Sequence, residues 1–206
     1  MKLLKESKGF TLIEAIVVIS VLAILAGTLI PLAIKNIEDS KISATTEDIR
    51  TLASSVTNFI SNTGRFPIRN GSSSDQLLAL YSGSWPDLPQ QSLPNGTFTS
   101  PGSGWSDGTW SDSIVNHFVS NGGDRYPAWN PSTRSGWHGP YLAKNGLDPW
   151  GHSYLIGVIG FWYKDTNPIY DKVWILSAGP DRKVQTSNQS STLSGDDIGL
   201  IIYIHD

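Results

Sequence analysis

Apolar residues in the first third of the chain follow two patterns, and both predict helix. From Phe10 to about Ile34 the chain is apolar almost without a break, and Glu14 is the one charged residue in this run. Residues 15–34 are twenty positions without a charge, and a helix of that length crosses the roughly 30 Å hydrocarbon core of a bilayer. Pro31 lies late in the run and is expected to loosen or kink the helix there.

The second pattern is a narrow apolar stripe on an otherwise polar segment. Its members recur every seven residues in two sets, which are Ile42, Ile49 and Val56, and Thr45, Leu52 and Phe59. This spacing places them on one face of a helix. Asn62-Thr63-Gly64, followed by Phe66-Pro67, predicts where the helix stops. We therefore expect one helix from about Phe10 to Asn62, roughly 80 Å long.

The remainder of the chain predicts a small sheet. Three segments rich in Val, Ile, Trp and Tyr are expected to be strands: Tyr154–Trp162, Lys172–Ser177 and Ile198–His205. We expect them to form an antiparallel sheet laid across the stripe of the helix. The predicted fold class is therefore α+β, with a long N-terminal transmembrane and stalk helix packed on a small C-terminal sheet domain.

The segment between helix and sheet has weaker patterns. Asp75–Tyr81 is a short apolar stretch that predicts one or two helical turns. Ser82–Ser113 has many Pro, Gly and Trp turn signals without a sustained period, so we interpret it as ordered loop. Ile114–Val119 predicts a short helix or strand. Residues from about 70 to 135 thus form a loop-rich insertion.

Composition excludes several classes of protein. The 206 residues contain no Cys, so neither disulfides nor thiolate sites are present. The formal charge is only -3, which argues against a nucleic-acid partner bound through phosphate contacts. Loss of residues 1–9 would leave 12 Lys and Arg against 17 Asp and Glu, a charge of -5.

The boundary at Gly9 is the most informative feature of the N-terminus. Lys2, Lys5 and Lys8 precede it, which by the positive-inside rule keeps the leader cytoplasmic. A short basic leader that ends in Gly, then Phe10 and an apolar run with Glu14, resembles the class III signal peptide of type IV pilins and type II secretion pseudopilins. An ordinary secretory signal cut after Ala26 and a plain anchor that never assembles are the alternatives.

The resemblance implies roles for three of these residues. A prepilin peptidase would cut between Gly9 and Phe10 and methylate the new amino terminus. The carboxylate of Glu14 would pair with that amine on a neighbouring subunit during assembly. A charged group in a membrane segment is costly and is usually present for a functional reason, and pairing makes both charges tolerable.

Two motifs in the C-terminal half resemble a narrower family. Trp137-His138-Gly139-Pro140-Tyr141-Leu142 and Asp148-Pro149-Trp150-Gly151-His152-Ser153-Tyr154 are similar to the signature of the major (G-type) pseudopilin of type II secretion. Physically these residues are structural. Proline and glycine shape turns, and the aromatic side chains supply apolar area to a small core.

A third motif resembles the calcium loop of the same pseudopilins. It consists of Ser177-Ala178-Gly179-Pro180-Asp181 and, later, Ser194-Gly195-Asp196-Asp197-Ile198. The resemblance implies Ca²⁺ held by the carboxylates of Asp181, Asp196 and Asp197, and by carbonyl oxygens around Ala178 and Ser194 and near Val184. Calcium binds six to eight oxygens on flexible loops. The gap of residues 182–195 is longer than is usual in the family, and the alternative is that the aspartates cap turns and face solvent.

These resemblances together imply a function and a domain organisation. The expected function is that of a structural subunit of a periplasmic pseudopilus that drives protein export. The alternative is a type IV pilin in a surface filament for adhesion, motility or DNA uptake. Expected segments are a leader (1–9), an assembly helix (10–34), a stalk helix (35–62) and a head (63–206). The protein would span the bacterial inner membrane once, with its head in the periplasm. Its partners would be copies of itself, minor pseudopilins, the prepilin peptidase and an inner-membrane assembly platform.

Other signals are weaker, and we expect no enzyme. Gly104-Trp105-Ser106-Asp107-Gly108 matches G-x-S-x-G but lacks the strand and helix that a nucleophile elbow needs. The four histidines lack zinc-ligand spacing. Four tryptophans in the insertion are open to two interpretations, burial against the sheet or exposure for contacts with subunits, cargo or polysaccharide: Trp85, Trp105, Trp110 and Trp129.

Overall fold

The computed structural model describes residues 9–70, 74–75, 77–84, 90–91, 111–143, 145–162, 172–187 and 190–204. The chain divides into two compact units, Met1–Ser40 and Lys41–Asp206. We call the second one the head unit. Helix α1 (Leu12–Thr63) begins in the first unit and ends in the second.

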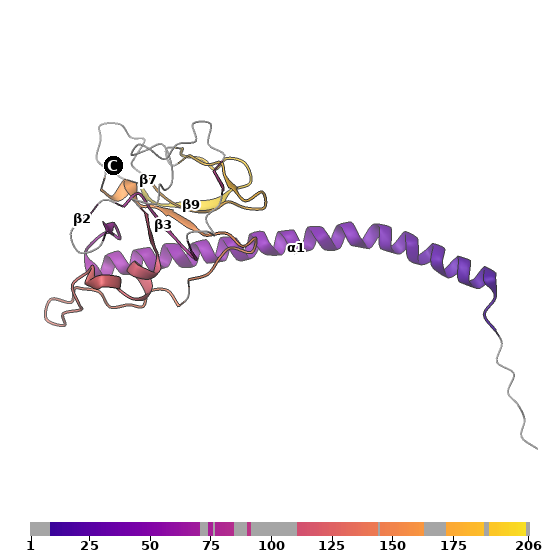
Figure 1. Ribbon diagram of the computed structural model, residues 1–206, viewed down its shortest axis with the longest axis horizontal. Coiled ribbons are helices and arrows are strands. Elements are labelled where there is room, and N and C mark those ends of the chain that lie inside the picture. Colours follow the sequence, from indigo (N-terminus) through magenta and orange to yellow (C-terminus); the bar gives the residue numbers. More distant parts are fainter. Residues whose placement is uncertain are drawn as a thin grey trace, which may run out of the picture. The chain divides into compact units, whose positions relative to one another are not determined.

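Helix α1 confirms most of the predicted helix (Figure 1). It begins two residues after the expected Phe10 and continues through Pro31. It ends at Thr63, and Gly64 follows in the left-handed region at φ 63° with its N–H donating to the Ile60 carbonyl at 2.8 Å. A glycine in this conformation is the common way to end a helix.

The predicted stripe is buried in the head unit. Its members Thr45, Ile49, Leu52, Val56 and Phe59 are all at most 4% exposed. Ile42 is the exception, because 38% of its surface remains exposed. The face that the heptad spacing selected is therefore the face that packs.

The head unit contains a mixed sheet of five strands (Figure 1). Their order across the sheet is β5 (Ser111–Ser113), β3 (Ala79–Tyr81), β6 (Leu155–Gly157), β7 (Lys172–Ser177) and β9 (Ile198–Ile204). The pairs β3–β6, β6–β7 and β7–β9 are antiparallel, as expected. Strand β5 pairs in parallel with β3, so the sheet is mixed rather than purely antiparallel.

Four further strands form two small pairs, and short helical turns lie between the strands. The pairs are β1 (Arg69–Asn70) with β2 (Ser74–Asp75), and β4 (Gln90–Gln91) with β8 (Lys183–Val184). The turns are a π-helix at Val115–Val119 and 3₁₀ turns at Gly122–Asp124 and Ile159–Phe161.

The core of the head unit joins the stripe of α1 to the sheet. Val56 and Phe59 pack in one cluster with Ile156, Val173 and Ile175 of the sheet. Phe59 is fully buried, and three aromatic rings meet it at steep angles of 74–87°: Phe118, Tyr126 and Tyr141, at centroid distances of 5.5, 4.7 and 5.5 Å. Steep edge-to-face contacts of this kind are favourable beyond the area they bury.

Several local predictions were wrong, because contacts between residues distant in sequence determine the local structure there. Within Asp75–Tyr81 the structure has strands rather than helical turns, because Ala79–Tyr81 pairs with β5 on one side and β6 on the other. The expected strand Tyr154–Trp162 ends at Gly157. A Cβ at Gly160 would collide with the backbone of Lys172, so the chain turns there against β7. The loop expected at Ser82–Ser113 contains β4 and β5 in its described part.

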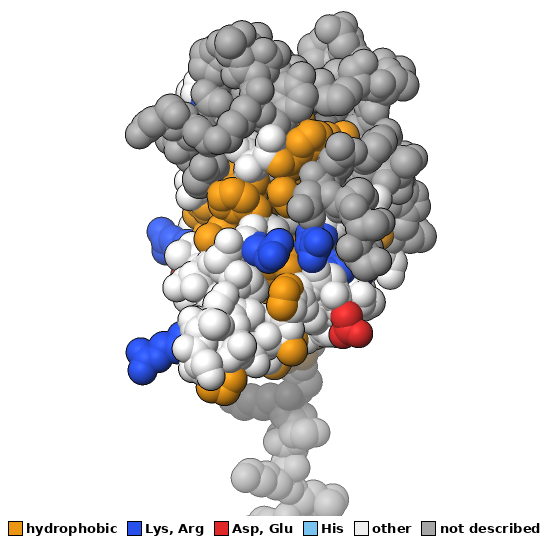
Figure 2. Space-filling view, turned by 90° about the vertical axis from the view of Figure 1, so that its left-hand side faces the viewer, with side chains coloured by type: hydrophobic (Ala, Val, Ile, Leu, Met, Phe, Trp, Pro, Cys, Tyr) orange, Lys and Arg blue, Asp and Glu red, His pale blue; other side chains and the backbone are white. Residues whose placement is uncertain are grey.

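One face of the structure carries both hydrophobic and basic side chains. In Figure 2 hydrophobic side chains gather in a band, and Lys and Arg side chains lie along its border.

Candidate assembly and cation sites

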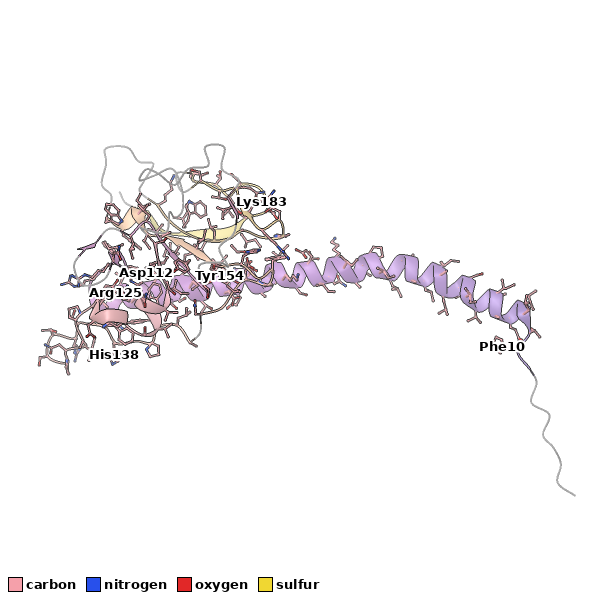
Figure 3. All side chains as sticks on the ribbon, viewed as in Figure 1. Phe10, Asp112, Arg125, His138, Tyr154 and Lys183 are labelled. Atoms are coloured by element: carbon pink, nitrogen blue, oxygen red, sulfur yellow. The ribbon has the colours of Figure 1, made fainter. Side chains whose placement is uncertain are left out.

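The predicted processing boundary lies just before helix α1. Gly9 and Phe10 are both exposed, and Phe10, labelled in Figure 3, exposes 77% of its surface. The leader residues 1–8 lie outside the described part of the chain. The structure thus places Phe10 outside the helix, two residues ahead of the first helical residue, Leu12.

Glu14 forms a reciprocal hydrogen-bonded cap with Thr11. Its Oε2 accepts from the Thr11 N–H at 2.9 Å and from the Thr11 hydroxyl at 2.7 Å. The Thr11 Oγ1 in turn accepts from the Glu14 N–H at 3.3 Å. This is a capping box, and it places the carboxylate at the positive end of the helix dipole. Thr11 was missed at the sequence level, although T-x-x-E at residues 11–14 is the signature that could have identified it.

The apolar part of α1 carries large exposed side chains. Large apolar side chains from Leu12 to Ile37 are between 47% and 77% exposed. The helix is long and apolar enough to cross a membrane, which is consistent with a single-pass anchored protein. Its hydroxyl side chains donate to backbone carbonyls about one turn earlier, at 2.7–3.0 Å: Ser20, Thr28, Ser40, Thr46, Ser54 and Thr57.

Asp148 organises the second pseudopilin-like motif. Its Oδ1 accepts from the N–H groups of Trp150 and His152 at 3.0 and 2.8 Å. Its Oδ2 accepts from the hydroxyl of Ser177 at 2.7 Å. The Ser177 oxygen also accepts from the Gly179 N–H at 3.1 Å. The motif is therefore structural, as its composition indicated, and it ties the turn at 148–152 to the end of β7.

The candidate calcium loop brings Asp181 and Asp196 together. The Asp196 Oδ2 accepts from the Asp181 N–H at 2.8 Å. The Asp181 Oδ1 accepts from the Lys183 N–H at 2.7 Å. A Cβ at Gly179 would collide with the Asp196 carbonyl, so this close approach requires glycine, and Gly179 has φ 63°.

Asp197 is the buried member of the loop. Only 6% of its surface is exposed, and its Oδ2 accepts from the N–H groups of Gln185 and Thr186 at 2.9 and 2.6 Å. Its Oδ1 is buried without a hydrogen-bond partner among the described residues. Burial raises the pKa of Asp197 above its ordinary value, although the bonds from Thr186 and Gln185 act in the opposite direction.

The two expected carbonyl donors flank this arrangement. Ala178 is fully buried and directly follows the last residue of β7. Ser194 is exposed, and its N–H donates to the Thr186 hydroxyl at 2.9 Å.

The loop fits calcium in its donor chemistry but is not arranged as a finished cation site. Three carboxylates and an unpaired buried carboxylate oxygen are what a hard cation seeks. Within the described part of the chain, however, no group of three or more His, Cys, Asp or Glu side chains converges to hold a metal. The side chain of Gln185 contacts Asp181 instead, with its Nε2 donating to Oδ2 at 2.5 Å.

A buried polar cluster beside β5 was missed by the sequence patterns. The Asp112 Oδ2 lies 2.7 Å from Arg125 Nη2 and 3.2 Å from His117 Nε2 (Figure 3). Since a carboxylate only accepts, the Nε2 of His117 carries the proton, and its Nδ1 accepts from the Tyr126 hydroxyl at 2.7 Å. Burial lowers the pKa of His117, against the opposing effect of Asp112.

Burial and hydrogen bonds act in opposite directions on the pKa of Asp112. Burial acts to raise it, but hydrogen bonds from His117 and Asn116 prevail and hold the pKa of Asp112 below its ordinary value. The cluster connects β5, the π-helix and the turn at Arg125. It therefore helps to hold these three segments of the head unit together.

A second polar contact borders a pocket against α1. The Tyr154 hydroxyl donates to Asp48 Oδ2 at 2.7 Å, and burial and then Asp48 raise the pKa of Tyr154 (Figure 3). The pocket has a volume of about 160 Å³, and its apolar wall includes Leu52, Ile114 and Leu142.

The tryptophan hypothesis is tested at one of its four positions. Trp129 is half-buried, and its ring lies 4.6 Å from the ring of the exposed His138. Trp85, Trp105 and Trp110 lie outside the described residues, as does the G-x-S-x-G segment 104–108.

Comparison with known proteins bears on the N-terminus. Residues 4–30 match the model of a family described as the prokaryotic N-terminal methylation motif. The match includes the Gly9–Phe10 boundary, Thr11 and Glu14. No curated protein and no solved structure matched the chain. A methylation motif at the start of a long apolar helix, followed by an α+β head, supports a type IV pilin-like or pseudopilin protein.

Proposed function

We propose that this chain is a structural subunit of a periplasmic pseudopilus that serves type II secretion. The observation that carries the proposal is the methylation motif on an apolar helix whose large side chains are exposed. An exposed apolar helix needs either lipid or other helices around it. A subunit that begins in the membrane and ends in a filament meets both needs in turn.

Processing and assembly follow from the N-terminal residues. A prepilin peptidase cuts between Gly9 and Phe10 and methylates the amino terminus of Phe10. Glu14 then pairs with the amine of a neighbouring subunit. In the isolated chain Thr11 donates both of its hydrogen bonds to Oε2 of Glu14, so the neighbour's amine would meet a carboxylate already held in place by the helix cap.

The secretion branch, rather than a surface pilus, is favoured by the C-terminal motifs. Asp148 and Ser177 join the D-P-W-G turn to the strand that leads into the aspartate loop. We propose that Ca²⁺ binds this loop through Asp181, Asp196 and Asp197, with carbonyl oxygens near Ala178 and Ser194. The unpaired buried Oδ1 of Asp197 supports this part of the proposal, because a bound cation would satisfy it.

An in-frame deletion separates the two filament functions. Proteins in the culture medium and filaments on the cell surface are compared between wild type, deletion strain and complemented strain. Loss of specific exoproteins with surface pili intact is the expected result. Loss of surface pili with normal export would overturn the secretion proposal and indicate a type IV pilin.

Processing is tested separately by mass spectrometry of the membrane-extracted protein. The expected mature chain begins at Phe10 with one added methyl group on its amino terminus. A chain that retains residues 1–9 in cells with an active peptidase would contradict this part of the proposal.

A further inference from the structure

The side chain of Gln185 bridges the two halves of the aspartate loop. Its Nε2 donates to Asp181 Oδ2 at 2.5 Å, and its Oε1 accepts from the Asp196 N–H at 3.2 Å. A Cβ at Gly195 would collide with this Oε1, and Gly195 has φ 66°. The turn at Gly195 therefore leaves room for the glutamine amide.

Gln185 also reaches the third aspartate through its backbone. Its N–H donates to Asp197 Oδ2 at 2.9 Å. One residue thus contacts Asp181 through its side chain, Asp197 through its backbone, and the backbone of Asp196. It lies in the segment that lengthens the loop relative to the resembling family, where the sequence assigned no ligand.

The amide group of Gln185 has the right polarity to replace a cation at Asp181. Its NH₂ carries partial positive charge, and a hydrogen bond to an ionised acceptor is stronger than one between neutral groups. Calcium would need the same carboxylate oxygens of Asp181. The Gln185 amide and a calcium ion therefore compete for Oδ2 of Asp181.

We propose that Gln185 is a built-in competitor of calcium that closes the loop in the metal-free protein and leaves Asp181 when the metal binds. This inference rests on the calcium part of the proposed function. It explains why the loop is ordered by internal hydrogen bonds although its carboxylates do not converge. It also makes Gln185 the residue that sets the calcium affinity of the loop.

The test uses the full chain in detergent and two variants of Gln185. Gln185→Ala removes the competitor, so calcium affinity measured by titration calorimetry rises about tenfold, while the melting temperature in EDTA falls. Gln185→Glu places a second carboxylate beside Asp181, so the EDTA melting temperature falls further and the rise on adding calcium is larger than in wild type. Ser191→Ala, an exposed position of the same loop, is the matched control and leaves both values unchanged.

The outcomes separate this inference from the function on which it rests. Wild-type binding with unchanged or weaker affinity in Gln185→Ala would overturn the competitor role, because weaker binding would make Gln185 a ligand. No binding to wild type or to either Gln185 variant at up to about 10 mM calcium would overturn the calcium site itself, and this inference with it. Tighter binding in Gln185→Ala, with a lower EDTA melting temperature, supports both.

Discussion

The buried carboxylate of Asp148 joins two parts of the head unit, and replacing Ser177 with Ala tests how much that junction stabilises the fold. The Ser177 hydroxyl donates to Asp148 Oδ2 at 2.7 Å and accepts from the Gly179 N–H at 3.1 Å. Asp148 is 4% exposed and Ser177 is fully buried, so water does not readily take the place of the lost hydroxyl.

The expected loss of stability follows from the two groups left without partners. A buried group deprived of its hydrogen-bond partner costs about 1–3 kcal/mol, and more when it is charged. Ser177→Ala leaves both an oxygen of a carboxylate and a backbone N–H unpaired, so we expect a loss of about 2–3 kcal/mol. At about 2–4 °C per kcal/mol for a domain of this size, the melting temperature falls by about 4–12 °C.

The assay is urea unfolding of the full chain in detergent, monitored by tryptophan fluorescence, with Asp148→Asn and the double variant measured alongside. Asp148→Asn keeps the shape of the side chain and removes its charge. Because the two side chains bond to each other, the double variant should lose at least about 1 kcal/mol less than the sum of the single losses. Additive losses, or a Ser177→Ala loss below about 0.5 kcal/mol, would refute the assignment of this bond as a main tie of the fold.

Four further predictions address assembly, core, pH and metal. Glu14→Ala should leave cleavage intact and strongly reduce filament yield on immunoblots of sheared or periplasmic fractions, and an unaltered yield would contradict the assembly role. Phe59→Ala should destabilise the head unit by about 3–5 kcal/mol in the same urea assay, and a loss below about 1 kcal/mol would contradict its place in the core. Burial lowers the pKa of His117 from its ordinary value of 6.5, so at mildly acidic pH the unfolded chain binds a proton that the folded chain does not. The free energy of unfolding should therefore be highest above about pH 6.5 and fall as the pH drops below it. The fall should be shallower in His117→Gln. EDTA should lower the melting temperature of wild type, with recovery on adding excess Ca²⁺ but not Mg²⁺, and an unchanged melting temperature would argue against the cation site.

The helix and its packing face were readable from the sequence because they depend on local periodicity. The heptad stripe selected the buried face of α1, and Gly64 marked its end. Strand β7 was predicted with its observed bounds, Lys172–Ser177, since a run of buried β-branched and aromatic residues has few alternatives.

The elements that the sequence did not predict depend on partners distant in the chain. Ala79–Tyr81 has the apolar content of a helical turn, but pairing with both β5 and β6 makes it a strand. The expected strand ends at Gly157, and Gly160 lies in the following 3₁₀ turn, where the backbone of Lys172 approaches it closely. The local sequence around Ala79–Tyr81 and Gly160 does not indicate which distant residues they contact.

The candidate cation site also has a part that the sequence predicted and a part that it did not. Its three aspartates were identified by motif, and the structure places Asp181 beside Asp196. The position of Gln185 between them was not predictable, because glutamine in a Ser- and Thr-rich segment has no distinguishing pattern. The capping role of Thr11 was predictable in principle from its spacing to Glu14.

The hydroxyl groups of α1 determine how freely the helix changes its surroundings. Ser20 and Thr28 each donate to a carbonyl of their own helix, as do Ser54 and Thr57 further along. Each hydroxyl therefore carries its acceptor with it, and no hydrogen bond has to be exchanged when water, lipid or protein replaces its neighbours. The two hydroxyl groups in the charge-free segment 15–34, those of Ser20 and Thr28, therefore need no partner from the surroundings, so this segment can be moved from one medium into another as if it were apolar throughout.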